Sequence, residues 1–134
     1  MKLTDLSKYI TTRLENLTGW SVYNKIVPDT ALYPYIVYNL GHGDSEERSR
    51  ITRNLEIDYY IDSTDNSDLL DMSEVVRRGK YVNDVLTVYG LDYSYQSENE
   101  GFYHCFHDWE DEIDTGETYI SRFQQRYVLH VYDS

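Results

Sequence analysis

One short segment constrains the fold of this chain more than any other. In residues 55–61, large apolar side chains alternate with polar ones. One face carries Leu55, Ile57, Tyr59 and Ile61, and the other carries Glu56, Asp58 and Tyr60. A period of two residues is that of a β-strand, and a strand with a single apolar face is typical of an antiparallel sheet that meets water on one side. The segment therefore predicts a sheet with one wet face.

Two other segments have the period of helices that would cover the apolar face. The first spans residues 3–17, and its apolar stripe consists of Leu3, Leu6, Ile10, Leu14 and Leu17. Thr4 is the predicted N-cap, Asp5 lies in the first turn, where the helix dipole favours an acid, and Gly19 is the predicted end.

The second helix is predicted to begin after a cap at Asn66 or Ser67. Its stripe consists of Leu69, Leu70, Met72, Val75, Val76, Val82, Val85 and Leu86. Gly79 is a poor helix former, so we expect it to bend the helix or split it, and Gly90 to end it.

Further strands are predicted from runs of β-branched and aromatic residues. They span residues 20–23, 35–40, 91–95, 102–109 and 119–132, and residues 110–117 between the last two are expected to form a loop because of their charge and Gly116. The element order is then α-β-β-β-α-β-β-β. The expected fold class is α+β, a single domain over residues 1–134 with a mainly antiparallel sheet packed by two helices.

Residues 41–53 contain almost no apolar side chain and are longer than a hairpin connection requires. We expect a polar, mobile loop that orders when the protein docks, because Ile51 alone offers little apolar contact to offset the ordering of the backbone. The candidate partner contacts in this loop are His42, Glu46, Glu47, Arg48, Arg50 and Arg53.

The charge of the chain limits its partners. The 134 residues include 24 acids and 12 bases, which gives a formal net charge of −12, and the acids are spread along the chain. Such a surface repels duplex nucleic acid and anionic membranes, although solubility alone also explains acidity of this kind. Cys105 is the single cysteine and no apolar run approaches about 20 residues, so we expect no intramolecular disulfide, export or membrane insertion.

No catalytic, cofactor or metal site is predicted. The segment from His104 to Asp108 contains two histidines and a cysteine, but no second Cys/His pair lies at zinc-site spacing. The acids between Asp62 and Asp68 are a fragment of a calcium loop without its glycine and final glutamate, and no nucleophile or phosphate-binding motif is present. There are two basic clusters, Arg48, Arg50 and Arg53 in one and Arg77, Arg78 and Lys80 in the other. The three arginines of the first are better explained as salt-bridge partners of an acidic neighbour than as a nucleic-acid footprint.

Four segments in order resemble one protein family. They are the first helix, residues 33–38 (Tyr-Pro-Tyr-Ile-Val-Tyr), residues 55–60 running into a capped helix, and residues 118–132. Together they cover nearly the whole chain, and it resembles the tail-completion, or tail-to-head joining, proteins of long-tailed Bacillus siphophages and their tail-terminator relatives. The polar stretch 41–53 departs from the family pattern.

The resemblance implies a structural virion protein, made in the host cytoplasm, that caps the finished tail tube and forms the attachment surface for the DNA-filled head. The implied partners are the tail tube protein and the head connector or stopper protein. It further implies a homo-hexameric ring in the virion, weak self-association when free, DNA passing through the channel without specific binding, and no membrane contact. The alternative is an acidic interaction module, such as a nuclease inhibitor or DNA mimic. A mimic should concentrate its carboxylates on one face, whereas here they are dispersed over strands, caps and loops. An enzyme is the third possibility.

Overall fold

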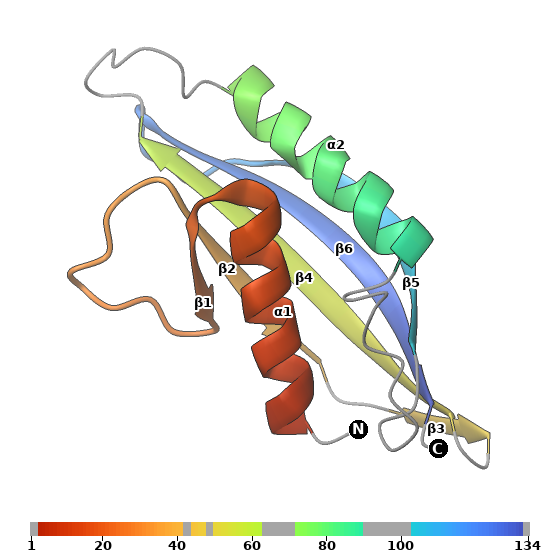
Figure 1. The fold of residues 1–134 in the computed structure, drawn as a ribbon. Coiled ribbons are helices and arrows are strands. Elements are labelled where there is room, and N and C mark those ends of the chain that lie inside the picture. The colour runs from red at the N-terminus through yellow and green to blue at the C-terminus, as the bar shows by residue number, and fades with distance from the viewer. Residues whose placement is uncertain (1–2, 42–43, 48–49, 63–71, 90–102, 133–134) are drawn as a thin grey trace.

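The computed structural model describes residues 3–41, 44–47, 50–62, 72–89 and 103–132. The elements, in chain order, are α1 (Leu3–Thr18), β1 (Ser21–Asn24), β2 (Tyr35–Leu40), β3 (Asp44–Glu47), β4 (Arg50–Asp62), α2 (Met72–Tyr89), β5 (Tyr103–Ile113) and β6 (Ile120–Tyr132). The fold is α+β, as expected, with both helices packed against one sheet (Figure 1).

The sheet is mostly antiparallel. Its strand order is β1-β2-β4-β6-β5, and β3 pairs with one end of β4 outside this order. The long strands β4 and β6 form the centre and pair from Arg50 with Tyr132 to Asp62 with Ile120. The exception is β1, which runs parallel to β2. Residues 25–34 must therefore carry the chain back past the length of β1 before β2 begins.

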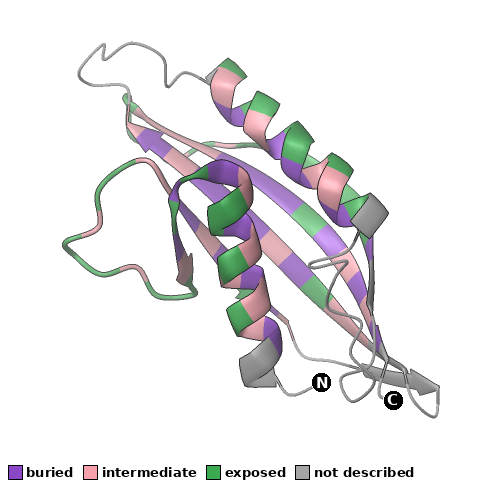
Figure 2. Cartoon of the chain, in the orientation of Figure 1, coloured by how far each residue is buried: buried purple, intermediate pink, exposed green. Residues whose placement is uncertain are grey.

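The two faces of the sheet differ as the alternation at residues 55–61 predicts. Leu55, Ile57, Tyr59 and Ile61 are all buried on the face that the helices cover. Figure 2 shows buried residues alternating with more exposed ones along β4 and β6. No helix covers the opposite face within the described part of the chain.

Helix α1 follows its apolar stripe, with Leu6, Ile10 and Leu14 buried against the sheet. It ends as predicted at Gly19, which has a φ of 74° and donates its backbone N–H to the carbonyl of Glu15 at 2.8 Å. A positive φ closes a helix and costs glycine nothing because it has no Cβ.

Helix α2 runs unbroken through Gly79, so the expected split is wrong. The structure gives another reason for this glycine. A Cβ built at Gly79 would lie 2.9 Å from a ring carbon of Phe123 and 3.2 Å from Nε2 of Gln125, so only glycine permits this approach of helix to sheet. Packing thus overrides the low helix propensity of glycine. The predicted cap at Asn66 or Ser67 and the predicted end at Gly90 lie outside the described residues.

After α2 the described residues contain two strands rather than the three expected. The predicted strand 91–95 lies outside the described residues. The predicted loop 110–117 is wrong in its first part, because β5 continues to Ile113 and pairs with β6. Acids in this stretch suggest a loop when only the sequence is considered. In the structure, residues 106–112 of the edge strand β5 are exposed on both of its faces, so the strand accommodates consecutive acids.

The expected loop 41–53 is corrected in the same way. Residues 44–47 form β3 and residues 50–53 form the first part of β4, so a short two-stranded extension stands where a loop was expected. Pairing of β4 with β6 supplies backbone hydrogen bonds that a polar sequence does not reveal. The mobility expected for this range stays a prediction. Neither described helix is long and apolar enough to cross a membrane.

Candidate protein-docking surface

The uncovered face of the sheet has an ion pair at its centre. Asp58 of β4 accepts hydrogen bonds at Oδ1 from Nε of Arg122 at 2.8 Å and from Nε2 of Gln124 at 3.0 Å. Although no helix covers Asp58, it is only 8% exposed, because its neighbours enclose it. The bond to Asp58 raises the pKa of the Arg122 guanidinium. The arginine is therefore held in one position at the surface.

Tyrosines extend from this ion pair toward β1. Arg122 lies over the ring of Tyr60 at 5.6 Å, and Tyr60 stacks on Tyr35 with centroids 5.2 Å apart. Tyr35 in turn contacts Tyr33 at 5.0 Å and Tyr23 at 5.9 Å. Burial, followed by a hydrogen bond with Tyr33, raises the pKa of Tyr35 to about 12. The rings form one continuous aromatic row across three strands.

A second arginine, Arg126, makes several contacts on the other side of the uncovered face. The guanidinium of Arg126 lies 4.6 Å from the ring centre of Trp109, donates to Oε1 of Gln124 at 3.1 Å and lies 3.5 Å from Oε1 of Glu56. An irregularity in the β5–β6 pairing between His107 and Trp109 sets Trp109 opposite Arg126. Bulges re-aim side chains in this way.

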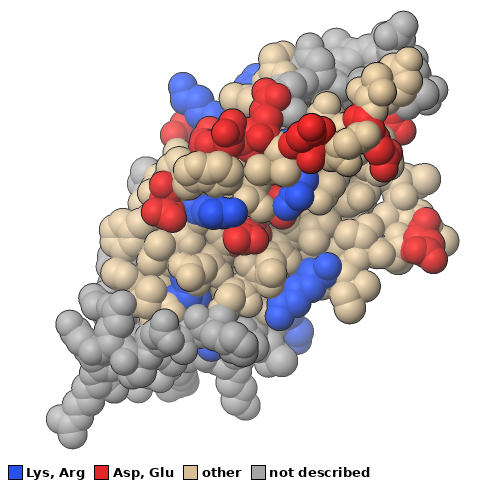
Figure 3. Space-filling view, turned by 180° about the vertical axis from the view of Figure 1, so that it is seen from behind, with Lys and Arg blue, Asp and Glu red and all other residues tan. Residues whose placement is uncertain are grey.

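Two margins of the sheet have opposite character. The loop of residues 25–34, which joins β1 to β2 and projects from the sheet in Figure 1, exposes 81% of both Ile26 and Leu32. Along β5 and its hairpin the exposed side chains include Asp108, Glu110, Asp111, Glu112, Asp114 and Glu117. Figure 3 shows acids gathered along one side of the uncovered face. Although the acids are dispersed along the sequence, the fold gathers some of them at this margin.

The predicted contact residues are only partly described. His42 and Arg48 lie outside the described residues, and the backbone places Glu46 and Glu47 in β3 and Arg50 in β4, with Glu47 paired to Arg50. Among the six predicted residues, the side chain of Arg53 is described, and its Nη1 donates to the carbonyl of Gly41 at 3.1 Å. The extension lies at the Arg50 end of β4, whereas the aromatic row crosses β4 at Tyr60, near its other end.

The surroundings of Cys105 disfavour a nucleophilic role for its thiol. It is buried, and burial raises its pKa far above the ordinary value, so the thiol stays protonated. His107 lies 2.8 Å from Glu110. Within the described ranges no group of three or more His, Cys, Asp or Glu side chains is arranged to hold a metal ion.

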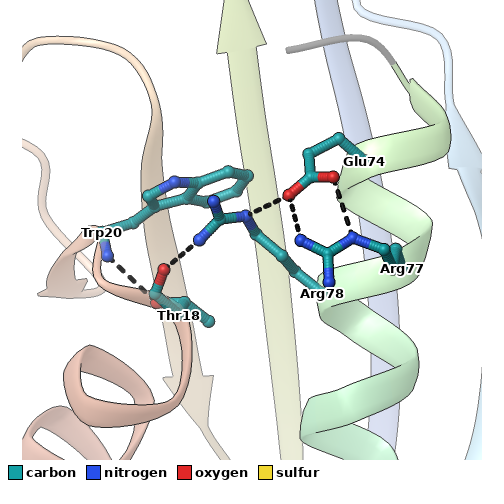
Figure 4. Close-up of polar contacts among 5 residues, drawn as sticks. All are labelled: Thr18, Trp20, Glu74, Arg77 and Arg78. Carbon is teal, nitrogen blue, oxygen red and sulfur yellow. Dashed lines mark hydrogen bonds and ion pairs between the residues drawn. The ribbon is translucent and has the colours of Figure 1, made fainter. Parts of the chain in front are cut away.

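Two of the basic residues at 77–80 bind within the molecule (Figure 4). Arg77 and Arg78 both contact Glu74, and the bonds with Arg77 contribute most to lowering the pKa of that carboxyl. Arg78 also donates to the backbone carbonyl of Thr18 at the end of α1 and lies 4.7 Å over the ring of Trp20. A cation suits a helix C-terminus, so Arg78 joins the two helices.

Sequence reasoning missed Arg122, Arg126 and Trp109, although Glu56, Asp58 and Tyr60 were predicted to face water. Local alternation identifies the wet face of a strand, but the opposing residues depend on pairing between distant segments. No protein-family model matches the chain. No match was found among curated proteins.

Proposed function

We propose that this chain is a structural virion protein that docks onto other proteins, caps the finished tail tube of a long-tailed phage and provides the surface to which the DNA-filled head attaches. The observation that carries the docking role is the uncovered sheet face, where two arginines and a row of aromatic rings are held in fixed contact. The assignment to phage tails rests on the family resemblance of the sequence.

The composition of this face supports a protein partner. Interface centres are enriched in Tyr, Trp and Arg and depleted in Lys. The described strands contain no lysine. Because Arg122 and Arg126 are already held by Asp58 and Gln124, they lose little conformational freedom when a partner docks.

Weak self-association of the free protein fits the same proposal. Subunits with a net charge of −12 repel each other, which opposes ring formation in solution. A tail tube end would present several docking sites at fixed spacing and so raise the local concentration of neighbours. A homo-hexamer would then form at the tube, between the tube protein and the head connector, with DNA passing without specific binding.

A complementation assay tests this function. Purified protein is added to separated heads and tails from a phage that lacks it, and infectious particles are counted. The double variant Tyr60→Ala/Trp109→Ala should reduce the count at least tenfold, whereas the control Tyr81→Ala, on the exposed side of α2, should not. If the unmodified protein restores no infectivity, the phage function is wrong. If the folded double variant joins normally, the sheet face is not the docking surface.

The predicted contacts of the β3–β4 extension are tested separately. Replacing Arg48, Arg50 and Arg53 with alanine should spare folding, because charged side chains in a polar segment contribute little to a hydrophobic core. If they pair with an acidic partner, head joining should fall while thermal unfolding stays unchanged. Normal joining by the folded triple variant would exclude the extension from the interface.

The acidic margin favours a second candidate, an inhibitor that imitates nucleic acid. Carboxylates gathered along β5 present negative charge on one side of the molecule, as a mimic requires. Replacement of Asp108, Asp111 and Asp114 with asparagine should then abolish inhibition in a nuclease assay. Joining activity that survives these replacements, with no nuclease inhibition by the unmodified protein, would reject this candidate.

A further inference from the structure

Helix α1 carries a hollow whose chemistry differs from that of the rest of this acidic chain. The hollow has a volume of about 300 Å³, and its described lining consists of Lys8, Tyr9, Thr12, Arg13 and Asn16. Each of these side chains can donate a hydrogen bond, two carry positive charge, and none is acidic. In a protein with twice as many acids as bases, this set is suited to an anion.

The charge of Arg13 is not compensated within the described structure. Its Nε is buried and has no hydrogen-bond partner among the described residues. The helix positions three and four residues away, where an acid could pair with it, hold Tyr9, Ile10, Asn16 and Leu17. A buried guanidinium N–H without an acceptor is costly, and an anion against the same planar group offsets part of that cost.

We propose that this hollow binds a carboxylate group from an acidic segment of a partner protein. A volume of about 300 Å³ is at the lower end for ligand sites and accommodates one or two side chains rather than a polymer. Arg13 matches the planar geometry of a carboxylate, while Lys8 supplies a second positive charge. Duplex DNA, with many charges, is repelled by the net charge of −12 far more than a short acidic segment is.

This site is independent of the proposed docking surface. Helix α1 lies on the covered side of the sheet (Figure 1). Tyr60 and Arg122 are paired neighbours on the uncovered side, because they alternate along their strands with buried Tyr59 and Phe123. A partner could therefore contact both regions only by reaching around the molecule, and each region can be tested without the other.

The test is a titration of the isotopically labelled full chain with a capped tetraglutamate peptide, followed through backbone amide shifts. Saturable shifts are expected in residues 8–16. Arg13→Gln should weaken binding at least tenfold, and Lys8→Gln, at an exposed position, should weaken it severalfold without disturbing the fold. The matched control Lys80→Gln removes one exposed charge from α2 and should change binding less than twofold.

Three results would overturn the proposal. The first is the absence of saturable shifts in α1. The second is that the folded Lys8→Gln and Arg13→Gln variants bind the peptide as tightly as the unmodified chain does. The third is that inorganic phosphate or duplex DNA binds at the same amides as tightly as the peptide, or more tightly. A capped tetraglutamine peptide should produce no shifts. Peptide binding that persists when the phage complementation assay fails would reject the proposed function alone.

Discussion

The central strands β4 and β6 carry hydrogen-bonded polar groups on both of their faces, and the two groups are built differently. Under α2, the hydroxyl of Tyr59 donates to Oε1 of Gln125 at 2.7 Å, and Nε2 of Gln125 donates to the carbonyl of Gly79 at 2.9 Å. On the uncovered face, Asp58 is held by Arg122 and Gln124. The first network lies in the core and meets a charge only at its edge, where Nε2 of Gln125 lies 3.5 Å from Oε1 of Glu110. The second is centred on an ion pair and borders water.

The difference separates stability from recognition. Buried Gln125 connects strand to helix, and its hydrogen bond to the carbonyl of Gly79 fixes the distance at which α2 can lie. The pair of Asp58 and Arg122 contributes less to folding because water can replace part of it, but it fixes a guanidinium at the surface. We therefore expect changes to the covered network to affect unfolding, and changes to the open network to affect docking.

The largest effect is expected from Gln125→Leu. It leaves the buried hydroxyl of Tyr59 without its acceptor and removes the side-chain donor to the carbonyl of Gly79, so the free energy of unfolding should fall by about 3 kcal/mol. Urea denaturation measures the change. Gln124→Leu is the matched control on the open face, and we expect about 1 kcal/mol, because Asp58 keeps its bond with Arg122. Equal losses in the two variants would break the comparison.

A smaller loss is expected from Gly79→Ala. Alanine favours a helix by about 1 kcal/mol, but the added methyl group meets Phe123 and Gln125 and should cost more than that gain. The net loss should be about 1 kcal/mol in the same denaturation experiment. Thr87→Ala, at an exposed position of α2, should stay within about 0.5 kcal/mol. Stabilisation by Gly79→Ala would show that the helix can move away from the sheet.

The parts of the fold that follow from local periodicity were predicted from the sequence. The stripe ending near Leu14 and the alternation from Leu55 to Ile61 give each segment its type and buried face without reference to the rest of the chain. The extent of β5 was not predicted, because the acids between Glu110 and Ile113 suit a loop unless β6 lies beside them.

The candidate surface was predicted only in outline. Asp58 and Tyr60 were placed on a wet face by alternation, but their partner Arg122 comes from a segment far along the chain. Trp109 reaches the same face after a pairing irregularity that has no marker in the sequence. For the same reason, the sequence suggested only the low helix propensity of Gly79. Its close approach to the ring of Phe123 depends on how the helix packs on the sheet.

Ionisation of the tyrosines at alkaline pH tests the comparison between the two faces of the sheet. Burial raises the pKa of Tyr35 to about 12 and raises that of Tyr59 well above its ordinary value of 10. A raised folded-state pKa means that the stabilisation is complete below pH 10 and is lost as pH rises through 12. The free energy of unfolding should therefore fall from pH 10 to 12, and Tyr35→Phe should reduce that fall. If Tyr35→Phe leaves the fall in the free energy of unfolding between pH 10 and 12 unchanged, the aromatic row on the uncovered face does not contribute to it.

The smallest effect on stability is expected in the loop between β1 and β2. Ile26 and Leu32 are each 81% exposed, so Ile26→Ser with Leu32→Ser should change the free energy of unfolding by less than about 0.5 kcal/mol. If recognition extends from the aromatic row into this loop, head joining should nevertheless fall. Val27→Ala is the control within the same loop. Normal joining by the double variant would confine recognition to the strands.

The pairing of β4 with β6 also determines how quickly the protein can fold. Its closest partners along the chain are Asp62 and Ile120, and its most distant are Arg50 and Tyr132, so all of α2 and β5 must be enclosed before this ladder can form. Closure of such long segments is the slow step in proteins dominated by distant contacts. The β5–β6 hairpin, closed by residues 114–119, can form early, and its docking onto β4 would set the folding rate.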